Sequence, residues 1–400
     1  MITIEKMIQE DKINCVGCYG CYNICPKKAI VMEEDEEGFR YPIVQQEKCI
    51  QCEACSRVCP VIHSIPDVEE RTPDTYAAIN EDWNIRRESS SGGIFHLLAN
   101  YVLKQGGAVY GAGFDEQWEV VHQVAENQAM LANLRVSKYV QSRIEDTYYK
   151  VKKTLESGRQ ALFVGTPCQC VALKCYLNKE YDNLVLVDFI CHGVPSPKVW
   201  RQYRTWRTKG KKIDRISFRN KNLSWERYLL LFLFKNNNKY LAEDLSHDLY
   251  LKGFLQNLYL RPSCHQCKFC HKNRPTDLTL ADFWGVQDVL PEMYDGKGTS
   301  LVFIHSAKGK ELFESLPAKK MKTEFDRAIQ YNPSMVRPSI PSKNRQRFFE
   351  EFIAGQQSID QIIKENTKIP LVQQVKGSLY RVLYHIPGVV WTYRKVKKGK

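Results

Sequence analysis

Two cysteine runs give the chain its first sign of chemistry. Each follows the pattern C-x2-C-x2-C-x3-C-P, first in "CVGCYGCYNICP" and again in "CIQCEACSRVCP". Three thiolates at two-residue spacing can bind three irons of one [4Fe–4S] cubane, and the fourth, which precedes proline, ligates the neighbouring cluster. The first cluster would then use Cys15, Cys18, Cys21 and Cys59, and the second would use Cys49, Cys52, Cys55 and Cys25.

The same eight cysteines could instead form a pair of zinc knuckles or a disulfide framework. Two complete copies of the signature favour clusters over both alternatives. Residues ~10 to ~63 resemble a bacterial-type two-cluster ferredoxin. Because a domain this small cannot build a large apolar core, we expect the clusters to hold its fold together.

A third cysteine-rich stretch, "CHQCKFCH", begins at Cys264 and is open to three interpretations. Cys264, Cys267 and Cys270 could bind zinc together with His265 or His271. The second half of the stretch also matches the C-x-x-C-H pattern of covalent haem attachment. That attachment requires export, and the first residues of the chain lack the basic and apolar segments of a signal peptide. The third interpretation is that the stretch holds part of an iron–sulfur cluster.

The composition is that of a globular protein whose charge is unevenly distributed. Of the 400 residues, 43% are hydrophobic and 26% are charged, and the formal net charge is +13. Residues 33–37 ("EEDEE") are acidic, whereas residues 377–400 are basic and contain no acid. Both segments could dock a partner, and the basic one could also contact an anionic membrane peripherally.

Two further features bear on the location of the protein. No stretch reaches the ~20 apolar residues that a membrane-spanning helix needs. Fifteen cysteines in a chain without a visible signal peptide favour metal binding in a reducing compartment over disulfides. We therefore expect a cytoplasmic protein.

The middle of the chain alternates between helical and strand patterns. Helices are predicted within residues 91–107 and 145–158 and in the segment between residues 165 and 183. Short apolar runs typical of strands occupy residues 108–114, 119–125, 160–165 and 183–190. This alternation predicts an α/β domain with a largely parallel sheet, and ligands at the carboxyl ends of its strands. Residues 213–220 and 228–241 predict an antiparallel excursion inserted into that sheet. Neither a G-x-G-x-x-G nor a P-loop motif is present, which weakens a simple nicotinamide dehydrogenase or NTPase interpretation.

Polar loops lie where such a sheet would bind a ligand. Residues 89–93 ("SSSGG") open a predicted helix and could hold a phosphate, although an ordinary helix cap is an alternative. "GTPCQC" also joins a strand to a helix, and "SKYVQS" offers Lys138 as a countercharge. Cys168 and Cys191 each follow a short strand, so a parallel sheet would bring both to one edge. They could equally be buried packing cysteines.

Five ordered motifs together resemble the coenzyme F420 hydrogenase/dehydrogenase β-subunit family, which also includes reductases of chlorophyll derivatives. The motifs are "SSSGGIFHLLANYVLKQGG", "VSKYVQS", "VGTPCQC", "FICHGVPSP" and "RPSCHQCKFCHKNRPTDLTLADFWG". The resemblance covers roughly residues 75 to 340, and none of the motifs would suffice alone. It implies an FAD-containing oxidoreductase with a further [4Fe–4S] cluster near the flavin.

The resemblance also implies which residues form these sites. FAD contacts would fall on Ser91, Gly92, Gly93, Ser137, Lys138, Thr166 and Pro167. The further cluster would be held by Cys168, Cys191, Cys264 and Cys267, which leaves Cys170, Cys175 and Cys270 as packing cysteines. Asp282 is expected to contribute to cofactor binding, in a place where relatives commonly have a Gly-Asp pair and this chain has Ala281 before it. His192 and Lys138 are the candidates for polarising or proton-handling groups near the flavin.

These parts predict an oxidoreductase that passes electrons between a small organic substrate, such as the deazaflavin coenzyme F420, and ferredoxin-type carriers. Its expected partner is ferredoxin or another redox protein or subunit, and no nucleic acid is expected. A ferredoxin-driven reductase of a small metabolite and an electron-transfer subunit of a larger complex are the alternatives. The expected domains are residues 1–65 (two-cluster ferredoxin), 75–340 (FAD and [4Fe–4S] domain) and 341–400 (helical, basic extension).

Overall fold

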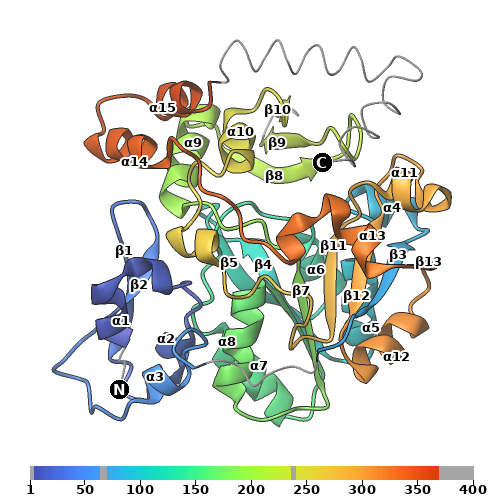
Figure 1. The fold of residues 1–400 in the computed structure, drawn as a ribbon, viewed down its shortest axis with the longest axis horizontal. Helices are drawn as coiled ribbons and strands as arrows, with labels where there is room; N and C mark the ends of the chain where they lie inside the picture. The colour runs from blue at the N-terminus through green and yellow to red at the C-terminus, as the bar shows by residue number, and fades with distance from the viewer. Residues whose placement is uncertain (1–3, 64–69, 236–239, 369–400) are drawn as a thin grey trace, which may run out of the picture.

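The computed structural model describes residues 4–63, 70–235 and 240–368 of the chain. Figure 1 shows a small N-terminal domain beside a large α/β domain, with a second, smaller sheet above the large one. The basic segment 377–400 lies outside the described residues, so the expected tail helix and its membrane contact stay predictions. No helix in the described ranges is long and apolar enough to cross a bilayer.

The N-terminal domain is built from short elements around its cysteine loops. Its helical elements are α1 (Ile4–Glu10), η1 (Lys12–Asn14), α2 (Gly20–Ile24) and α3 (Ala54–Arg57), and its strands β1 (Ile30–Glu34) and β2 (Arg40–Val44) form an antiparallel hairpin. Tyr19 and Glu53, which follow the second cysteine of each run, both adopt left-handed backbone conformations. Gly17 and Gln51, which precede it, do the same. The two copies of the motif therefore share one backbone path.

The α/β domain contains a mixed sheet of eight strands in the order β13-β3-β12-β11-β7-β6-β4-β5. The strands are β3 (Asp74–Ile79), β4 (Ala108–Phe114), β5 (Val120–Ala125), β6 (Ala161–Gly165), β7 (Leu184–Phe189), β11 (Leu278–Asp282), β12 (Ser300–Ile304) and β13 (Lys319–Thr323). Only β4, β6, β7 and β11 run parallel to one another, and the remaining pairings are antiparallel. The α/β prediction is confirmed, whereas a largely parallel sheet holds only for this central part.

Alternating side chains of the central strands face two helical layers. Tyr110, Phe163 and Leu186 pack with helices α7 (Thr147–Glu156) and α8 (Pro167–Leu177). Val109, Leu162 and Val185 pack on the other face with α5 (Ile94–Lys104), α6 (Gln128–Leu134) and α12 (Ala307–Ser315). Because both faces are covered, the strands read as continuous apolar runs. Shorter elements complete the domain: α4 (Trp83–Arg87), η2 (Pro262–Gln266), α11 (Val286–Val289), η3 (Pro291–Met293), α13 (Phe325–Ala328), η4 (Ile329–Tyr331) and η5 (Pro333–Met335).

The predicted antiparallel excursion is a separate sheet and is not inserted into the large one, which corrects that expectation. Its order is β10 (Tyr240–Asp244), β9 (Leu229–Phe234) and β8 (Ile213–Asn220). The sheet buries its apolar side chains in a core of its own, together with helices α9 (Pro197–Thr208), α10 (Leu249–Leu255), α14 (Arg345–Ala354) and α15 (Ile359–Asn366). Trp200 of α9 lies at its centre, stacked on Phe232 with 5.9 Å between ring centroids.

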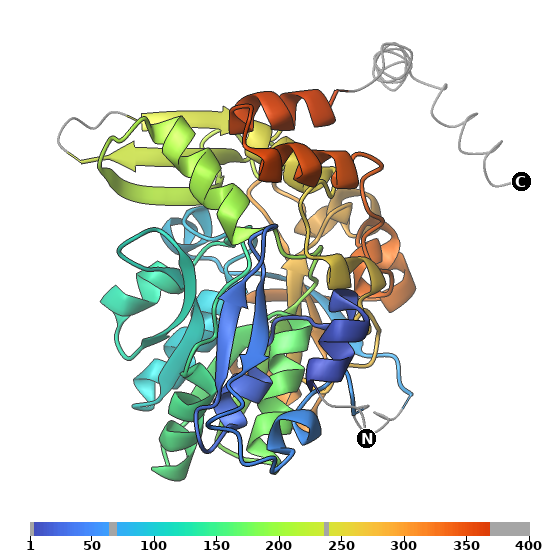
Figure 2. The same ribbon diagram turned by 90° about the vertical axis from the view of Figure 1, so that its left-hand side faces the viewer.

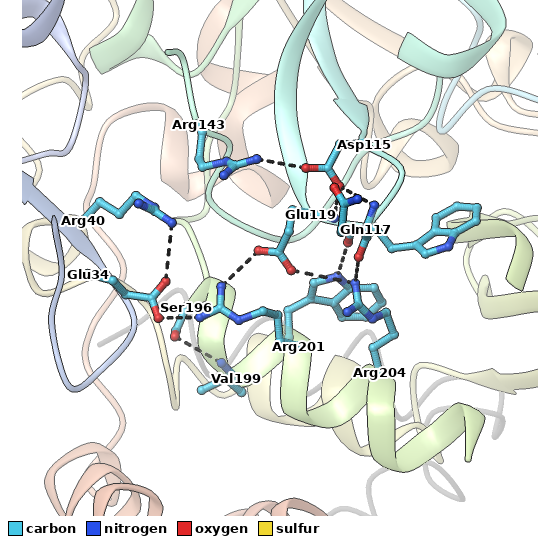
Figure 3. A network of polar contacts seen from close by, with 12 residues as sticks. Glu34, Arg40, Asp115, Gln117, Glu119, Arg143, Ser196, Val199, Arg201 and Arg204 are labelled. Atoms are coloured by element: carbon cyan, nitrogen blue, oxygen red, sulfur yellow. Dashed lines mark hydrogen bonds and ion pairs between the residues drawn. The ribbon is translucent and has the colours of Figure 1, made fainter. Parts of the chain in front are cut away.

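The N-terminal domain is fastened to the rest of the chain through its β1–β2 hairpin (Figure 2). Glu34 forms an ion pair with Arg201 of α9. Arg201 also pairs with Glu119, with 3.0 Å between Arg201 Nη1 and Glu119 Oε2 (Figure 3). At the tip of the hairpin, Glu37 pairs with Arg345 of α14. From the sequence alone the acidic run could dock a partner, but these two of its carboxylates are engaged within the chain. Their cationic partners lie 167 and 308 residues away in the sequence.

Candidate functional site

The carboxyl ends of β6, β7 and β11 border a cavity of about 430 Å3, here called the large cavity. Most residues expected to contact a flavin line it: Ser91, Gly93, Ser137, Lys138, Thr166, His192 and Asp282. Pro167 lines a second, smaller cavity next to it. Gly92 lines neither, because its N–H and carbonyl are bonded to Ser300 and Asn80. A side chain at Gly92 would meet the carbonyl oxygen of Ala78 at 2.4 Å, so the residue is needed for packing against β3.

Lys138 presents a cation to the large cavity. Its Nζ donates hydrogen bonds of 2.8 Å to the backbone carbonyls of Asn133 and Arg135, and neither acceptor carries a charge. Burial lowers the pKa of Lys138 to about 7. Close by, the backbone N–H and the hydroxyl of Ser137 bond to the hydroxyl of Ser90. An anionic ligand at this end of the cavity would supply the countercharge that Lys138 lacks.

Arg219 of β8 closes the other side of the large cavity. Its Nη2 donates to Asp282 Oδ1 at 3.0 Å, an oxygen that also accepts a bond from Trp225 Nε1. Its guanidinium lies 3.9 Å from the ring centroid of Tyr228 and 5.2 Å from that of Trp284. Its Nε is buried without a hydrogen-bond partner. Arg219 was not predicted from the sequence, because a single arginine in a strand belongs to no recognisable motif.

Two histidines in the wall of the large cavity are held neutral. Burial lowers the pKa of His192, whose Nε2 lies 2.6 Å from Asn257 Oδ1. Burial also lowers the pKa of His122 to about 4, and its ring nitrogens bond to Ser142 Oγ and the Val164 carbonyl. His122 was another residue that sequence patterns did not reveal. A neutral imidazole can donate or accept a proton in a hydrogen bond without adding a charge to the site.

The small cavity, of about 40 Å3, gathers cysteines from three separate parts of the chain. Its walls include Cys168 at the start of α8, Cys191 after β7, and Cys264 and Cys267 at η2. Burial, together with the nearby thiols of Cys267 and Cys264, raises the pKa of the Cys168 thiol to about 12. Burial likewise raises the pKa of Cys191, again together with the other three thiols. Four thiols that affect one another in this way are a donor set suited to a cubane.

Cys270 lies on the same wall, in contact with Cys267. A hydrogen bond from the Cys270 thiol is the main cause of a lowered pKa at Cys267, about 7, and the same bond raises the pKa of Cys270. Cys267 is thus the thiolate of the pair and Cys270 the donor. Cys170 differs, because its buried thiol bonds to the Val187 carbonyl. In the described residues, no three His, Cys, Asp or Glu side chains are gathered around the position of a single metal ion.

Cysteines of both runs lie close together in the N-terminal domain. Burial raises the pKa of the Cys18 thiol, and the thiols of Cys59, Cys21 and Cys15 raise it further. Burial also raises the pKa of Cys55, and the Cys25 thiol adds to the rise. Each of these sets includes the fourth cysteine of the other run, as the predicted crossed ligand sets require. Cys55 also acts on Cys21 and Cys59, so the assignment of ligands to each cluster stays a prediction.

The large and small cavities and the N-terminal domain are contiguous. Cys191, His192, Gly193 and Thr166 line both cavities. Val16, which follows Cys15 directly, lines the small cavity from the N-terminal side. Helix α8 begins at the small cavity and packs against α2 of the N-terminal domain. A line of candidate redox sites therefore runs from the large sheet edge into the cysteine loops.

Two family models match the chain. Residues 158–327 match the model for the C terminus of the coenzyme F420 hydrogenase/dehydrogenase beta subunit, and residues 14–62 match the model described as "4Fe-4S dicluster domain". Residues 158–327 therefore resemble the C-terminal domain of that beta subunit, and residues 14–62 form a 4Fe–4S dicluster domain at the N-terminal side. The chain is related to iron–sulfur electron-transfer subunits of oxidoreductases.

Curated relatives match different parts of this chain. The F subunit of the F420H2 dehydrogenase from Methanosarcina mazei is 23% identical over 194 residues, which cover 46% of the chain and 54% of that protein. The chain therefore spans about half the length of this relative. An uncharacterised ferredoxin of Methanocaldococcus jannaschii is 38% identical over 59 residues, which cover 15% of the chain and 73% of the ferredoxin.

A solved structure also resembles this chain. It is a chain of the F420-reducing [NiFe] hydrogenase complex from Methanosarcina barkeri, with a TM-score of 0.44 and 17% identity. The match covers 75% of the present chain and 94% of the other.

Proposed function

We propose that the chain is an oxidoreductase subunit that exchanges electrons between a small organic substrate and ferredoxin-type carriers through FAD and three [4Fe–4S] clusters. The observation that supports this most directly is the contiguity of the sites. The large cavity shares a wall with the small one, and Val16 joins the small cavity to the first cysteine loop. A substrate site, a cluster site and a two-cluster domain in contact provide an unbroken route.

The residues of the large cavity fit FAD. Lys138 lacks an acidic partner in the described part of the chain, and the backbone N–H groups that precede α5 and α8 are of the kind that bind phosphates. Arg219 Nε is a buried donor without a partner. Ser91, Gly93, Ser137, Lys138 and Thr166 would therefore hold the cofactor, and neutral His192 would be a proton-handling group at the wall shared with the small cavity. Bound there, FAD would supply the conversion between two-electron and one-electron transfer.

The substrate of this subunit is proposed to be a deazaflavin such as coenzyme F420 or another planar organic molecule. Aromatic side chains are the supporting feature, since Tyr228, Trp284 and Phe254 all line the large cavity. A ring system held against them would leave room for flavin at the sheet edge. The proposed partner is a further redox protein or subunit, as in the multi-subunit enzymes named above.

The decisive experiment is anaerobic analysis of iron, acid-labile sulfide and flavin per chain, followed by a screen of electron donors. We expect about twelve irons, from three cubanes of four each. We also expect about one FAD, and bleaching of its absorbance when reduced F420 is added. A protein with eight irons and no flavin would contradict the proposal, and one with FAD that no donor reduces would contradict the proposed substrate.

FAD affinity is expected to depend on pH through Lys138. Its lowered pKa of about 7 means that the free protein holds this charge below pH 7 and loses it above. Because an anionic cofactor favours the charged form, binding should weaken as the pH rises from 6 to 8, by up to roughly tenfold. Fluorescence titration of flavin-depleted protein would measure this, and Lys138→Met should bind weakly at both pH values.

Lys221 offers a matched control for this titration. Burial lowers its pKa to about 7 as well, but it does not line the large cavity, and its Nζ bonds to the backbone carbonyls of Arg86, Ser91 and Lys297. Lys221→Met should keep the pH dependence of the parent protein. If Lys221→Met abolished that dependence and Lys138→Met preserved it, Lys138 would not be the group that faces the cofactor.

A further inference from the structure

Arg261 is a fully buried arginine whose partners carry no negative charge. Its Nε donates to the Cys15 carbonyl at 2.8 Å, its Nη1 to Gln141 Oε1 at 3.0 Å and its Nη2 to the Arg40 carbonyl at 3.1 Å. Its guanidinium stacks on Tyr41, with 4.3 Å to the ring centroid. All three acceptors are neutral oxygens. The N–H donors of the guanidinium therefore have hydrogen-bond partners, but its positive charge has no adjacent negative charge.

Other buried arginines of the chain are neutralised. Arg219 pairs with Asp282, Arg274 with Asp188, and Arg86 with Asp295. For Arg261 no carboxylate lies within ion-pairing distance in the described residues, and Asp35 acts on it only from farther away. A buried charge without a counterion is strongly unfavourable, and a guanidinium does not escape the cost by losing its proton. The position therefore calls for an anion that side-chain carboxylates do not supply.

Arg261 lies between two groups of cysteines. On one side it packs on the Cys15–Cys18 loop, where a side chain at Gly17 would come within 2.8 Å of Arg261 Nη1. On the other side the Arg261 carbonyl accepts a bond from the N–H of Cys264, whose thiol lines the small cavity. Burial raises the pKa of Cys264 to about 11, and Arg261 is among the groups that oppose the rise.

A [4Fe–4S] cube with four thiolate ligands is the anion that such a position would take. The thiolate charges exceed those of the iron–sulfide core, so the complex is negative in both oxidation states, and nearby charge is one of the factors that set its reduction potential. A cation in a low-dielectric interior favours the more negative, reduced form of each neighbour. One guanidinium placed between two clusters would act on both.

We propose that Arg261 is a shared counter-cation of two clusters, the one on Cys15, Cys18, Cys21 and Cys59 and the one on Cys168, Cys191, Cys264 and Cys267. As a positioning residue it raises both reduction potentials together. It also ties the dicluster domain to the α/β domain through Cys15 and Arg40. The inference rests on the third cluster of the proposed function.

The test is an anaerobic redox titration of the full-length, cluster-loaded protein, monitored by electron paramagnetic resonance. In Arg261→Met the two neighbouring clusters should become harder to reduce. At the potential where each is half-reduced in the parent protein, the reduced-to-oxidised ratio should fall about tenfold, which is 59 mV for one electron. The cluster on Cys49, Cys52, Cys55 and Cys25 should keep its potential and serves as an internal reference. Arg261→Lys should recover most of the shift, because it keeps the charge.

Two further variants separate charge from structure. Gln141→Glu places a carboxylate where Gln141 Oε1 now accepts from Arg261, so it neutralises the guanidinium without removing it and should lower the same two potentials. It replaces Arg261→Met if that variant does not fold. Arg201→Met removes a cation from the same domain interface, where it pairs with Glu34 and Glu119, and should leave the potentials unchanged.

Iron analysis keeps the two proposals distinguishable. If the parent protein contains about twelve irons and neither Arg261→Met nor Gln141→Glu moves a potential, the role of Arg261 is wrong and the proposed function stands. A uniform shift of all three clusters would overturn it as well, because it would indicate a general loosening. If the parent protein contains only about eight irons, the third cluster of the proposed function fails first, and the shared counter-cation fails with it.

Discussion

Replacing Cys267 with serine is expected to lower the iron content from about twelve to about eight atoms per chain, because one cubane loses a ligand. This expectation rests on the small cavity, which Cys267 lines together with Cys168, Cys191 and Cys264. Cys267 is also the thiolate of its pair with Cys270. The measurement is colorimetric iron and sulfide analysis of anaerobically reconstituted protein. The dicluster domain should keep its spectroscopic signals, since its eight cysteines are untouched.

Cys270→Ser is the matched control, made three residues away on the same wall. It should keep all twelve or so irons, because Cys270 donates a hydrogen bond and is not needed as a ligand. The serine hydroxyl can still donate a hydrogen bond to Cys267, so the potential of the third cluster should stay close to that of the parent protein. If Cys270→Ser lost a cluster while Cys267→Ser kept it, the two cysteines would have exchanged the roles assigned to them.

Replacing Arg274 with methionine is expected to destabilise the protein by about 3–5 kcal/mol, since it leaves a buried carboxylate unpaired. Arg274 Nη1 lies 3.1 Å from Asp188 Oδ2, and the side chains are only 2% and 1% exposed. Asp188 sits at the end of β7 and lines the large cavity, and Arg274 lines the small one, so the pair stands between the two sites. Anaerobic urea unfolding, followed by circular dichroism, would measure the loss.

Two companion variants test the cause. Asp188→Asn combined with Arg274→Met should restore much of the stability, because no buried charge remains. Arg86→Met removes an equally buried arginine, but its partner Asp295 is 41% exposed and can be hydrated, so the cost should be about 1 kcal/mol. Equal losses in Arg86→Met and Arg274→Met would show that the buried carboxylate is not the source of the effect.

Local sequence patterns predicted the parts of this protein that depend on neighbours in the chain. Each of the predicted runs at residues 108–114, 119–125, 160–165 and 183–190 contains a strand within one residue of the expected ends, because a buried strand requires a short apolar run. Parallel strands place their carboxyl ends at one edge, which is why Cys168 and Cys191 could be expected to meet. Most of the residues assigned to the flavin line one cavity for the same reason.

Ion pairs between residues far apart in the sequence could not be predicted from such local patterns. The acidic run at residues 33–37 was interpreted as a possible docking surface. No nearby residue in the sequence indicates that Arg201 pairs with Glu34 and Arg345 with Glu37. Arg219 and Arg261 were missed because a single arginine has no spacing to recognise. The small β8–β10 sheet was assigned to the wrong place, since alternation of apolar residues predicts a strand but not which sheet it joins.

The duplicated cysteine motif is symmetrical in sequence but not in its surroundings. The loop from Cys15 to Cys18 is enclosed against Arg261 and the small cavity, whereas in its counterpart Ile50, Gln51 and Cys52 are exposed to solvent. One copy thus faces the interior and the other faces solvent. The hairpin is held to the α/β domain by ion pairs, so under the proposed function electrons could enter or leave at the exposed loop without a swing of the domain. Changes to the exposed loop would then alter the outer contact and leave the inner one undisturbed.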